Sequence, residues 1–393
     1  MKLRSKLLTV AAVAVTGIGL AVLPMAASNA AEACAGAWSA SQVYVANNTA
    51  SQSGHNYRAK WWTQNESPAT HSGQWDVWAD QGACGGTTPP DDPTTPPDNP
   101  PPGGTKMASA PYVYPGWGNP PAPSTLTGTG IRSYTIAFVL ANGCNPVWDG
   151  EGGLTGGVHA SWINAAKAAG ASIVPSIGGW QGNKLGPNCS TPDALAGAYQ
   201  KVIDAFGLQA IDIDIENTDE FENTVVADRI VDALKIVKQR NPSVKTILTF
   251  GTSPTGPNYY GSRLIDQAKA KGANIDIFTQ MPFDFGGGGD MYGATVGATE
   301  GLKNKLKSTF GWSDATAYAH MGISGMNGLS DQQEKTDPAT WTRIRDYAKS
   351  KGLARFTFWA VNRDRPCPGG GVVSDCSGID QSVWQFTSIS AGF

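Results

Sequence analysis

Short runs rich in β-branched and aromatic residues recur from about residue 110 onward, separated by stretches whose apolar residues lie three or four positions apart. The strand-like runs begin at Ala110, Ser133, Ala171, Leu208, Lys245, Ile275, Thr316 and Ala354. The helical pattern is clearest over residues 160–170, 191–207, 225–240 and 337–352. Eight strand–helix units in nearly three hundred residues predict a (β/α)8 TIM barrel, an α/β fold.

Local signals at the helix starts agree with this pattern. Thr191 precedes Pro192 and Asp337 precedes Pro338, and a capping residue followed by proline is typical of a helix N-terminus. The competing fold is a doubly wound sheet with a phosphate-binding loop. Neither GxGxxG nor GxxxxGK(S/T) follows a strand-like run, which disfavours that fold.

Composition divides the chain into four parts. Residues 1–30 carry basic residues, then an apolar run to about Leu23 and small residues up to Ala30, which predicts an export signal. A retained membrane anchor is disfavoured because the run is short. Residues 86–106 are rich in Pro, Thr and Asp and predict an extended linker. The linker separates a small module (residues 31–85, expected to be β-rich and disulfide-stapled) from the barrel (residues 107–393).

The overall composition restricts the classes of binding partner that we expect. The net charge of -3 and pI near 5.8 give no reason to expect nucleic acid or an anionic membrane. Gly, Pro and Trp are frequent and charged residues are scarce, as in many secreted carbohydrate-active proteins. We expect a secreted, extracellular monomer.

Export permits disulfides, and six cysteines leave fifteen pairings open. The linker favours Cys34–Cys84, while Cys367–Cys376 would close a short Gly-rich loop and Cys144–Cys189 would join two neighbouring loops. Zinc is the weaker reading, because the chain has no CxxC pair and its four histidines are scattered. We therefore expect neither a metal nor a cofactor.

The run "QAIDIDIEN" (residues 209–217) alternates isoleucine with acidic residues. In a barrel strand, alternate side chains face the lumen and the helices, so Asp212, Asp214 and Glu216 would line the lumen, with Glu216 at the C-terminal rim where such barrels perform chemistry. Three neighbouring acids cannot all ionise cheaply, so at least one pKa should rise and a proton should be shared. That suits a general acid. The alternatives are an ordinary strand with one wet face and a Ca²⁺ or Mg²⁺ site.

Seven large aromatic residues crowd the small module, more than a fold of that size can bury. They are Trp38, Tyr44, Tyr57, Trp61, Trp62, Trp75 and Trp78. The stretch "YRAKWWTQNESP" (residues 57–68) resembles the AKWWT signature of chitin- and cellulose-binding modules of family 5/12. The resemblance implies that Trp61, Trp62 and Tyr44 present exposed rings to a polysaccharide.

Four motifs of the large module resemble those of family 18 glycoside hydrolases, the chitinases and their relatives. "LQAIDIDIE" (residues 208–216) resembles the DxxDxDxE signature, and "SIGG" (176–179) resembles the SxGG of the preceding strand. "TQMPFDF" (279–285) is similar to the MxYD region, and "FTFWAVNRD" (356–364) to the last strand with its tryptophan. The resemblance covers about residues 108–393.

The resemblance implies a role for each matching residue. Glu216 would protonate the glycosidic oxygen, Asp214 would orient the substrate N-acetyl group, and Asp212 would hold or share the proton. The substrate's own acetamido oxygen would attack, so no second enzymic nucleophile is needed. Further substrate contacts are implied for Trp359, Met281, Asp284, Ser176 and Gly178.

This sequence departs from the family pattern at three positions and lacks one insertion. Gln209 and Ala210 replace the first Asp and a Gly of the acidic motif. Phe283 or Phe285 stands where the family has a tyrosine hydroxyl, and loss of such a donor costs about 10²–10³ in rate. Tyr292 is a candidate replacement. Residues 325–353 leave room for only a loop and one helix, which predicts an open groove without an additional α+β subdomain.

Three functions fit these patterns. The first is a secreted chitinase that acts on chitin and chito-oligosaccharides by a retaining, substrate-assisted route, in the endo mode. The second is a chitin-binding, lectin-like protein on an inactive barrel, as the missing tyrosine would suggest. The third is an endo-β-N-acetylglucosaminidase on N-glycans, which the small module disfavours because a soluble glycan needs no tether.

Overall fold

The structure is a computed structural model that describes residues 34–73, 76–84 and 106–393. These residues fall into two compact units, each described here by itself. The expected export signal, Trp75 and nearly all of the expected linker lie outside the described residues. Within the described ranges, no helix is both long enough and apolar enough to cross a membrane.

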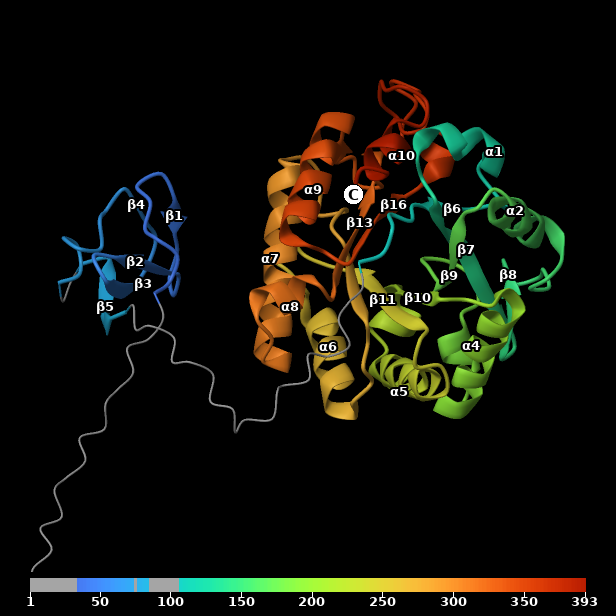
Figure 1. The fold of residues 1–393 in the computed structure, drawn as a ribbon, viewed down its shortest axis with the longest axis horizontal. Helices are drawn as coiled ribbons and strands as arrows, with labels where there is room; N and C mark the ends of the chain where they lie inside the picture. Colours follow the sequence, from blue (N-terminus) through green and yellow to red (C-terminus); the bar gives the residue numbers. More distant parts are fainter. Residues whose placement is uncertain (1–33, 74–75, 85–105) are drawn as a thin grey trace, which may run out of the picture. The chain divides into compact units, whose positions relative to one another are not determined.

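The small unit consists of two antiparallel sheets (Figure 1). One sheet pairs β1 (Val43–Tyr44) with β4 (Thr63–Gln64), and the other has the order β2 (Thr49–Gln52), β3 (His55–Ala59), β5 (Trp78–Ala83). Its core buries Tyr44, Tyr57 and Trp78, and the rings of Tyr44 and Trp78 meet edge-on with centroids 4.9 Å apart. The predicted disulfide Cys34–Cys84 is confirmed and supplies the crosslink that so small a core needs.

Eight parallel strands form the centre of the large unit in the order of the sequence. They are β6 (Tyr112–Val113), β7 (Ser133–Asn142), β9 (Ser172–Gly178), β10 (Ala210–Ile215), β11 (Lys245–Gly251), β12 (Ile277–Met281), β13 (Met321–Met326) and β16 (Arg355–Trp359). The first and last strands meet where Met107 N–H donates to the Ala354 carbonyl (2.8 Å) and Ser109 Oγ donates to the Phe356 carbonyl (2.8 Å). The TIM barrel is confirmed.

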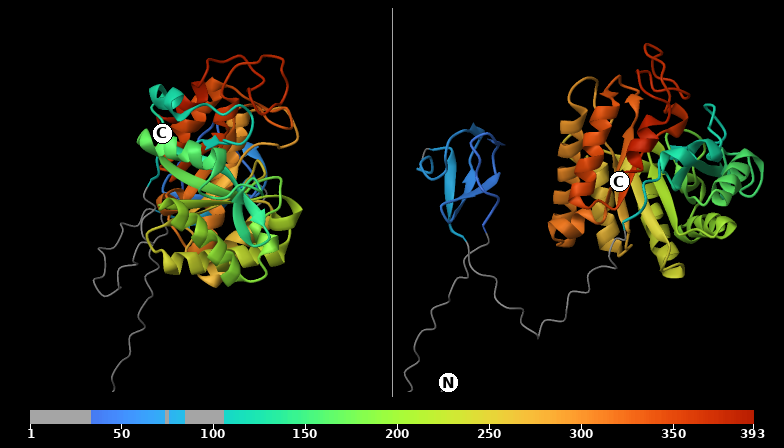
Figure 2. Two further views of the ribbon diagram at one scale, coloured as in Figure 1. Left: turned by 90° about the vertical axis from the view of Figure 1, so that its right-hand side faces the viewer. Right: turned by 45° about the horizontal axis from the view of Figure 1, so that its top comes forward.

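Helices surround these strands, as both views in Figure 2 show. They are α1 (Pro123–Leu126), α2 (Gly157–Ala168), α3 (Leu185–Asn188), α4 (Pro192–Phe206), α5 (Thr224–Arg240), α6 (Tyr259–Lys271), α7 (Met291–Phe310), α8 (Asp314–Tyr318), α9 (Pro338–Lys351) and α10 (Gln385–Ser390). The predicted caps are confirmed: Thr191 accepts from Ala194 N–H (3.2 Å), and Asp337 accepts from Thr340 N–H (2.8 Å). Short 3₁₀ turns cover Thr127–Thr129 and Val361–Arg363, and a π turn covers Asn217–Phe221.

The structure differs from the predicted elements near the seventh strand. The strand-like run at Thr316 begins as helix α8, because Ser313 Oγ accepts from Thr316 N–H (3.1 Å) and caps a helix there; the strand itself starts at Met321. Between β13 and β16 lie only the hairpin β14 (Gly328–Leu329)–β15 (Lys335–Thr336) and α9. Another hairpin arises where β8 (Asn145–Trp148) pairs with β7.

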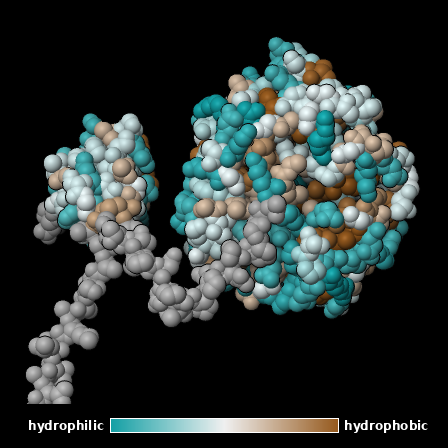
Figure 3. Space-filling model, in the orientation of Figure 1, coloured by the Kyte–Doolittle hydropathy of each residue, from teal (hydrophilic) through white to brown (hydrophobic). Residues whose placement is uncertain are grey.

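The surface of the large unit is a mosaic of polar and apolar residues in the view of Figure 3. Its exposed large apolar side chains lie in similar places along the chain. Each lies in a loop that follows a strand or in the first turn of the helix after that loop. They are Trp117, Val158, Trp180, Val225, Tyr259, Val373 and Val383. Within residues 106–393, exposed apolar groups thus gather on the C-terminal edge of the barrel.

Candidate active site

Strand β10 carries the acidic residues in the predicted orientation. Ile211, Ile213 and Ile215 are buried in the large hydrophobic cluster that joins the strands to the helices. Asp212 and Asp214 are also buried, on the opposite face of the strand, which is the barrel lumen. Glu216 follows directly after the strand and is half-buried at the C-terminal edge. The three carboxyl groups therefore lie at successive heights in the lumen, and Glu216 lies nearest the rim.

Asp212 lies lowest and accepts hydrogen bonds on both oxygens. Oδ2 accepts from the hydroxyl groups of Tyr112 (2.7 Å) and Ser176 (2.8 Å). Oδ1 accepts from Thr249 Oγ1 (2.6 Å) and from the guanidinium of Arg355 (3.1 Å). The sequence indicated Ser176, but it did not indicate Tyr112, Thr249 or Arg355.

Asp214 has fewer partners. Oδ2 lies 3.4 Å from the Tyr112 hydroxyl, and no described group donates to the buried Oδ1. Burial raises the pKa of Asp214 well above its usual range, and the charges of Glu216 and Asp212 raise it further, against Arg355 and Lys184. The unpartnered Oδ1 of Asp214 can accept a further hydrogen bond.

Glu216 is poised to hold a proton near neutral pH. Burial raises its pKa to about 7; Lys184 acts in the opposite direction, and the carboxyl groups of Asp284 and Asp331 add to the rise. A carboxylic acid with a pKa near the working pH is the form that general acid catalysis requires. The prediction that burial and neighbouring acids raise a pKa in this strand is supported.

Two glycines at the end of β9 allow close contacts with the strands on its two sides, β10 and β7. Gly178 has φ +116°, and a Cβ at that position would overlap the carbonyl oxygen of Asp214. A Cβ on Gly179 (φ +88°) would lie 2.9 Å from the ring of Phe138. The SxGG motif thus has a structural reason here: Ser176 donates to Asp212, Gly178 lets β9 approach Asp214, and Gly179 leaves room for the ring of Phe138.

Aromatic rings build one wall beside the carboxyl groups. Trp359 at the end of β16 stacks on Phe138, with centroids 5.4 Å apart and planes 13° apart. Tyr112 and Tyr114 meet the same indole at 5.8 and 6.3 Å. Trp359 therefore lies next to Tyr112, whose hydroxyl donates to Asp212.

The loop after β12 forms another part of the rim. Met281 is buried at the strand end, and Phe283, Asp284 and Phe285 are half-buried. The carboxylate of Glu334 fastens this loop by accepting from the backbone N–H groups of residues 284 (2.7 Å), 285 (2.6 Å) and 287 (3.0 Å). In return, Asp284 Oδ1 accepts from Gln332 N–H (3.0 Å). No motif in the sequence indicated Glu334, whose partners lie some fifty residues away along the chain.

Tyr292 lies in a different setting from the carboxyl groups. It occupies the first turn of α7, and the guanidinium of Arg343 from α9 lies 3.9 Å from its ring centroid. Tyr112 is the tyrosine whose hydroxyl contacts the acidic strand. Tyr292 as a substitute for the missing hydroxyl has no support from these contacts.

The small unit exposes the tandem tryptophans but not Tyr44. Trp61 and Trp62 are 48% and 59% exposed, whereas Tyr44 is only 2% exposed. The hydroxyl of Tyr44 accepts from Ser39 N–H (2.8 Å). The expectation that Tyr44 faces a polysaccharide is wrong, because its ring fills the core against Trp78.

The remaining expectations concern cysteines and metals. The pairs Cys144–Cys189 and Cys367–Cys376 are bonded as predicted. In the described part of the chain, no group of three or more His, Cys, Asp or Glu residues is arranged to hold a metal ion.

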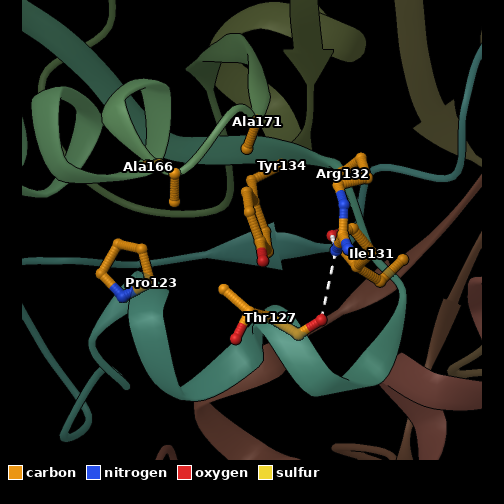
Figure 4. Close-up of a pocket in the computed structure, with 8 residues that line it drawn as sticks. Pro123, Thr127, Ile131, Arg132, Tyr134, Ala166 and Ala171 are labelled. Atoms are coloured by element: carbon orange, nitrogen blue, oxygen red, sulfur yellow. Dashed lines mark hydrogen bonds between the residues drawn. The ribbon is translucent and has the colours of Figure 1, made fainter.

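A separate cavity, of about 10 Å³, lies between the first two helices of the barrel and the start of β7 (Figure 4). There Arg132 donates to the Thr127 carbonyl (3.2 Å). A cavity of that size has room for about one water molecule. It is too small to take a sugar.

Residues 37–79 match carbohydrate-binding module family 5/12. The small unit belongs to that family. The family 5/12 module therefore has its exposed tandem tryptophans where the AKWWT resemblance implies a polysaccharide contact.

Two curated relatives have chitinase in their names. The chain is 28% identical over 254 residues to a probable bifunctional chitinase/lysozyme of Escherichia coli (strain K12), covering 60% of this chain and 28% of the relative. It is 26% identical over 251 residues to Endochitinase 11 of Metarhizium anisopliae, covering 60% of this chain and 48% of the relative. The chain thus spans less than half the length of either curated relative.

The barrel also resembles solved structures. The catalytic domain of a hyperthermophilic chitinase from Pyrococcus furiosus superposes with a TM-score of 0.67 at 25% identity, covering 74% of this chain and 96% of that domain. The family 5/12 module and the chitinase-like barrel agree with the resemblances seen in the sequence.

Proposed function

We propose that the chain is a secreted chitinase that hydrolyses β-1,4-linked N-acetylglucosamine polymers with retention of configuration. The observation that carries this proposal is the acidic ladder of β10: a half-buried Glu216 with a pKa of about 7 above Asp214, whose pKa is raised by burial and whose Oδ1 has no partner among the described residues. The chitinase-like barrel and the family 5/12 module support the substrate class. Secretion accords with three disulfides and no free cysteine among the described residues.

The geometry suits a substrate-assisted route. Glu216 donates its proton to the glycosidic oxygen as the bond from that oxygen to the anomeric carbon breaks. The carbonyl oxygen of the substrate's acetamido group attacks the same carbon, and Asp214 Oδ1 accepts the acetamido N–H. The carboxylate of Glu216 then takes a proton from water, which opens the cyclic intermediate and restores the acetamido group with retained configuration.

The rim supports endo-type cutting. Between β13 and β16 the chain forms only a short hairpin and one helix, so these residues build no tall wall over the rim. A polymer can then enter from the side, and cuts fall within the chain. Cleavage of a soluble chitin derivative should give a range of product lengths early in the reaction, and early release of dimers alone would contradict endo action.

The lectin-like alternative has one observation in its favour, since Phe283 or Phe285 stands where the family has a tyrosine. Turnover of a chromogenic chitobioside by the wild type beside Glu216→Gln separates the two functions. We expect the wild type to turn over and Glu216→Gln to lose at least about 10²-fold in kcat, within the usual range for a general acid. Products of inverted anomeric configuration, or equal rates in the two proteins, would contradict the proposal.

A further inference from the structure

A guanidinium group lies in the barrel lumen below the acids of β10. Arg355 and Asp212 form an ion pair at 3.1 Å, and both side chains are 0% exposed. The guanidinium also donates to hydroxyl groups from three other strands: Thr249 (2.9 Å), Thr279 (3.2 Å) and Thr135 (3.1 Å). Arg355 is therefore held from β7, β11 and β12 as well as by its ion pair with β10.

The hydrogens around Asp212 can be assigned from this geometry. Thr249 accepts from Arg355, so its single hydroxyl hydrogen is free to go to Asp212. The hydroxyl of Tyr112 is 2.7 Å from Asp212 but 3.4 Å from Asp214, so its hydrogen goes to Asp212. With Ser176, Asp212 accepts four hydrogen bonds, which fill both lone pairs of each oxygen. A proton on Asp212 would displace one of these donors.

Asp214, in contrast to Asp212, accepts few hydrogen bonds. Its Oδ1 receives no hydrogen bond from the described residues, and no cation bonds either oxygen directly. The Tyr112 oxygen faces Asp214 Oδ2 at 3.4 Å and, with its own hydrogen committed to Asp212, can accept one. Of the two aspartates, Asp214 has room for a proton and Asp212 does not.

We propose that Arg355 is a positioning residue that keeps Asp212 a carboxylate throughout the reaction, so that the proton of the Asp212–Asp214 pair stays on Asp214. Asp212 then serves as a fixed counter-charge instead of a proton acceptor, unlike the role that the family resemblance implies. Asp214 keeps its Oδ1 available to the acetamido N–H without exchanging a proton with Asp212. This inference rests on the proposed chitinase function.

Several charged or titratable groups face the Asp212–Asp214 pair, and each of them can influence the measured pH profile. They are Tyr112 from β6, Arg355 from β16, Glu216 at the end of β10 and Lys184 from the loop after β9. Of these, only Arg355 makes a direct ion pair with Asp212. Replacing Arg355 therefore changes the charge at Asp212 while leaving the surroundings of Glu216 largely in place.

The test compares Arg355→Lys and Arg355→Gln with the wild type on a soluble chromogenic chito-oligosaccharide. Without the positive charge the Asp212–Asp214 pair loses its counter-ion, so the acid limb of kcat/KM should move upward by about one pH unit or more in Arg355→Gln. Arg355→Lys keeps the charge, and its acid limb should stay near that of the wild type. An unshifted acid limb in folded Arg355→Gln would overturn the inference, whereas an inactive wild type would instead defeat the proposed function.

A second comparison does not depend on the folding of the Arg355 variants. Asparagine resembles a neutral carboxylic acid but cannot replace a carboxylate that accepts four hydrogen bonds. Asp214→Asn should therefore keep a kcat at least about tenfold above that of Asp212→Asn, which corresponds to about 1.4 kcal/mol in the barrier. A kcat of Asp214→Asn equal to or below that of Asp212→Asn would overturn the inference.

Discussion

Lys184 Nζ lies 3.4 Å from the backbone carbonyl oxygen of Glu216 and 3.0 Å from Asp219 Oδ1, and the lysine side chain is only 1% exposed. This buried ammonium group favours the ionised form of Glu216, whereas burial, Asp284 and Asp331 favour the protonated form. The balance leaves the pKa of Glu216 at about 7. Such a group can give up a proton in one step and take it back in the next.

Replacing Lys184 with methionine should shift the pH–rate profile. The proposed acid works when protonated, so kcat/KM of the wild type should fall as the pH rises through about 7. Without the ammonium charge the pKa of Glu216 rises, and the alkaline limb should move upward by about one pH unit. The measurement is kcat/KM on a soluble chito-oligosaccharide across the neutral and alkaline range.

Lys305→Met is the matched control for this experiment. Lys305 pairs with Asp266 on the outer helices (2.6 Å), so the loss of its charge should leave the alkaline limb unmoved. An alkaline limb that stays in place or moves to lower pH in Lys184→Met would contradict the assigned electrostatics.

Strand periodicity made the acidic ladder predictable, since isoleucines on one face and carboxyls on the other require only the alternation of a strand. The same rule shows that Arg355, Thr357 and Trp359 share the lumen face of β16. It could not pair Arg355 with Asp212, because which residues lie at one height depends on the stagger of all eight strands. The role of Glu334 could not be predicted for the same reason, because its partners lie far away along the chain, in the loop after β12.

Tyr44 illustrates a different limit of predicting side-chain exposure from sequence. In the two-residue strand β1, Val43 faces solvent and Tyr44 faces the core. So short a run offers no periodicity from which to tell its inner face from its outer one. Resemblance to the family motif placed the tandem tryptophans correctly, but it did not determine which further aromatic is exposed.

Glu220 should make stability depend on pH. It is buried in the π turn that follows Glu216, and burial raises its pKa from 4.5 to about 8, with Lys184 acting in the opposite direction. Between these values the folded state holds a proton that the unfolded state has released, so stability is lost as the pH rises. Each such carboxyl lowers the free energy of unfolding by about 1.4 kcal/mol per pH unit in that window. Glu220→Gln should flatten the slope by about that amount in denaturant unfolding.

Glu222→Gln provides the control for the unfolding series. Glu222 is an exposed carboxyl two residues further along the chain, and its replacement should keep the wild-type slope. A wild-type slope retained in Glu220→Gln would show that Glu220 is not protonated in the folded state.

Gly178→Ala should damage both stability and catalysis. The residue has φ +116°, and an added Cβ would overlap the carbonyl oxygen of Asp214, so β9 and β10 must separate. Gly207→Ala is the control, because it also has a positive φ (+60°) but its Cβ meets nothing within 4 Å. Gly207→Ala should cost about 1 kcal/mol, and Gly178→Ala should cost more and also lower kcat. Equal losses of stability with unchanged kcat in both variants would argue against close packing of β9 on Asp214.

Adsorption to crystalline chitin should depend on the exposed tryptophans of the small unit. Trp61→Ala with Trp62→Ala removes two rings that are 48% and 59% exposed, and activity on crystalline chitin should fall because the tether no longer raises the local concentration of substrate. Activity on soluble chito-oligosaccharides should stay within about twofold, since the barrel is untouched. Tyr44→Phe keeps the buried ring and removes only the hydroxyl that accepts from Ser39 N–H, so it should adsorb like the wild type. Equal loss of activity on solid and soluble substrates in the double variant would contradict a tethering role for the two tryptophans.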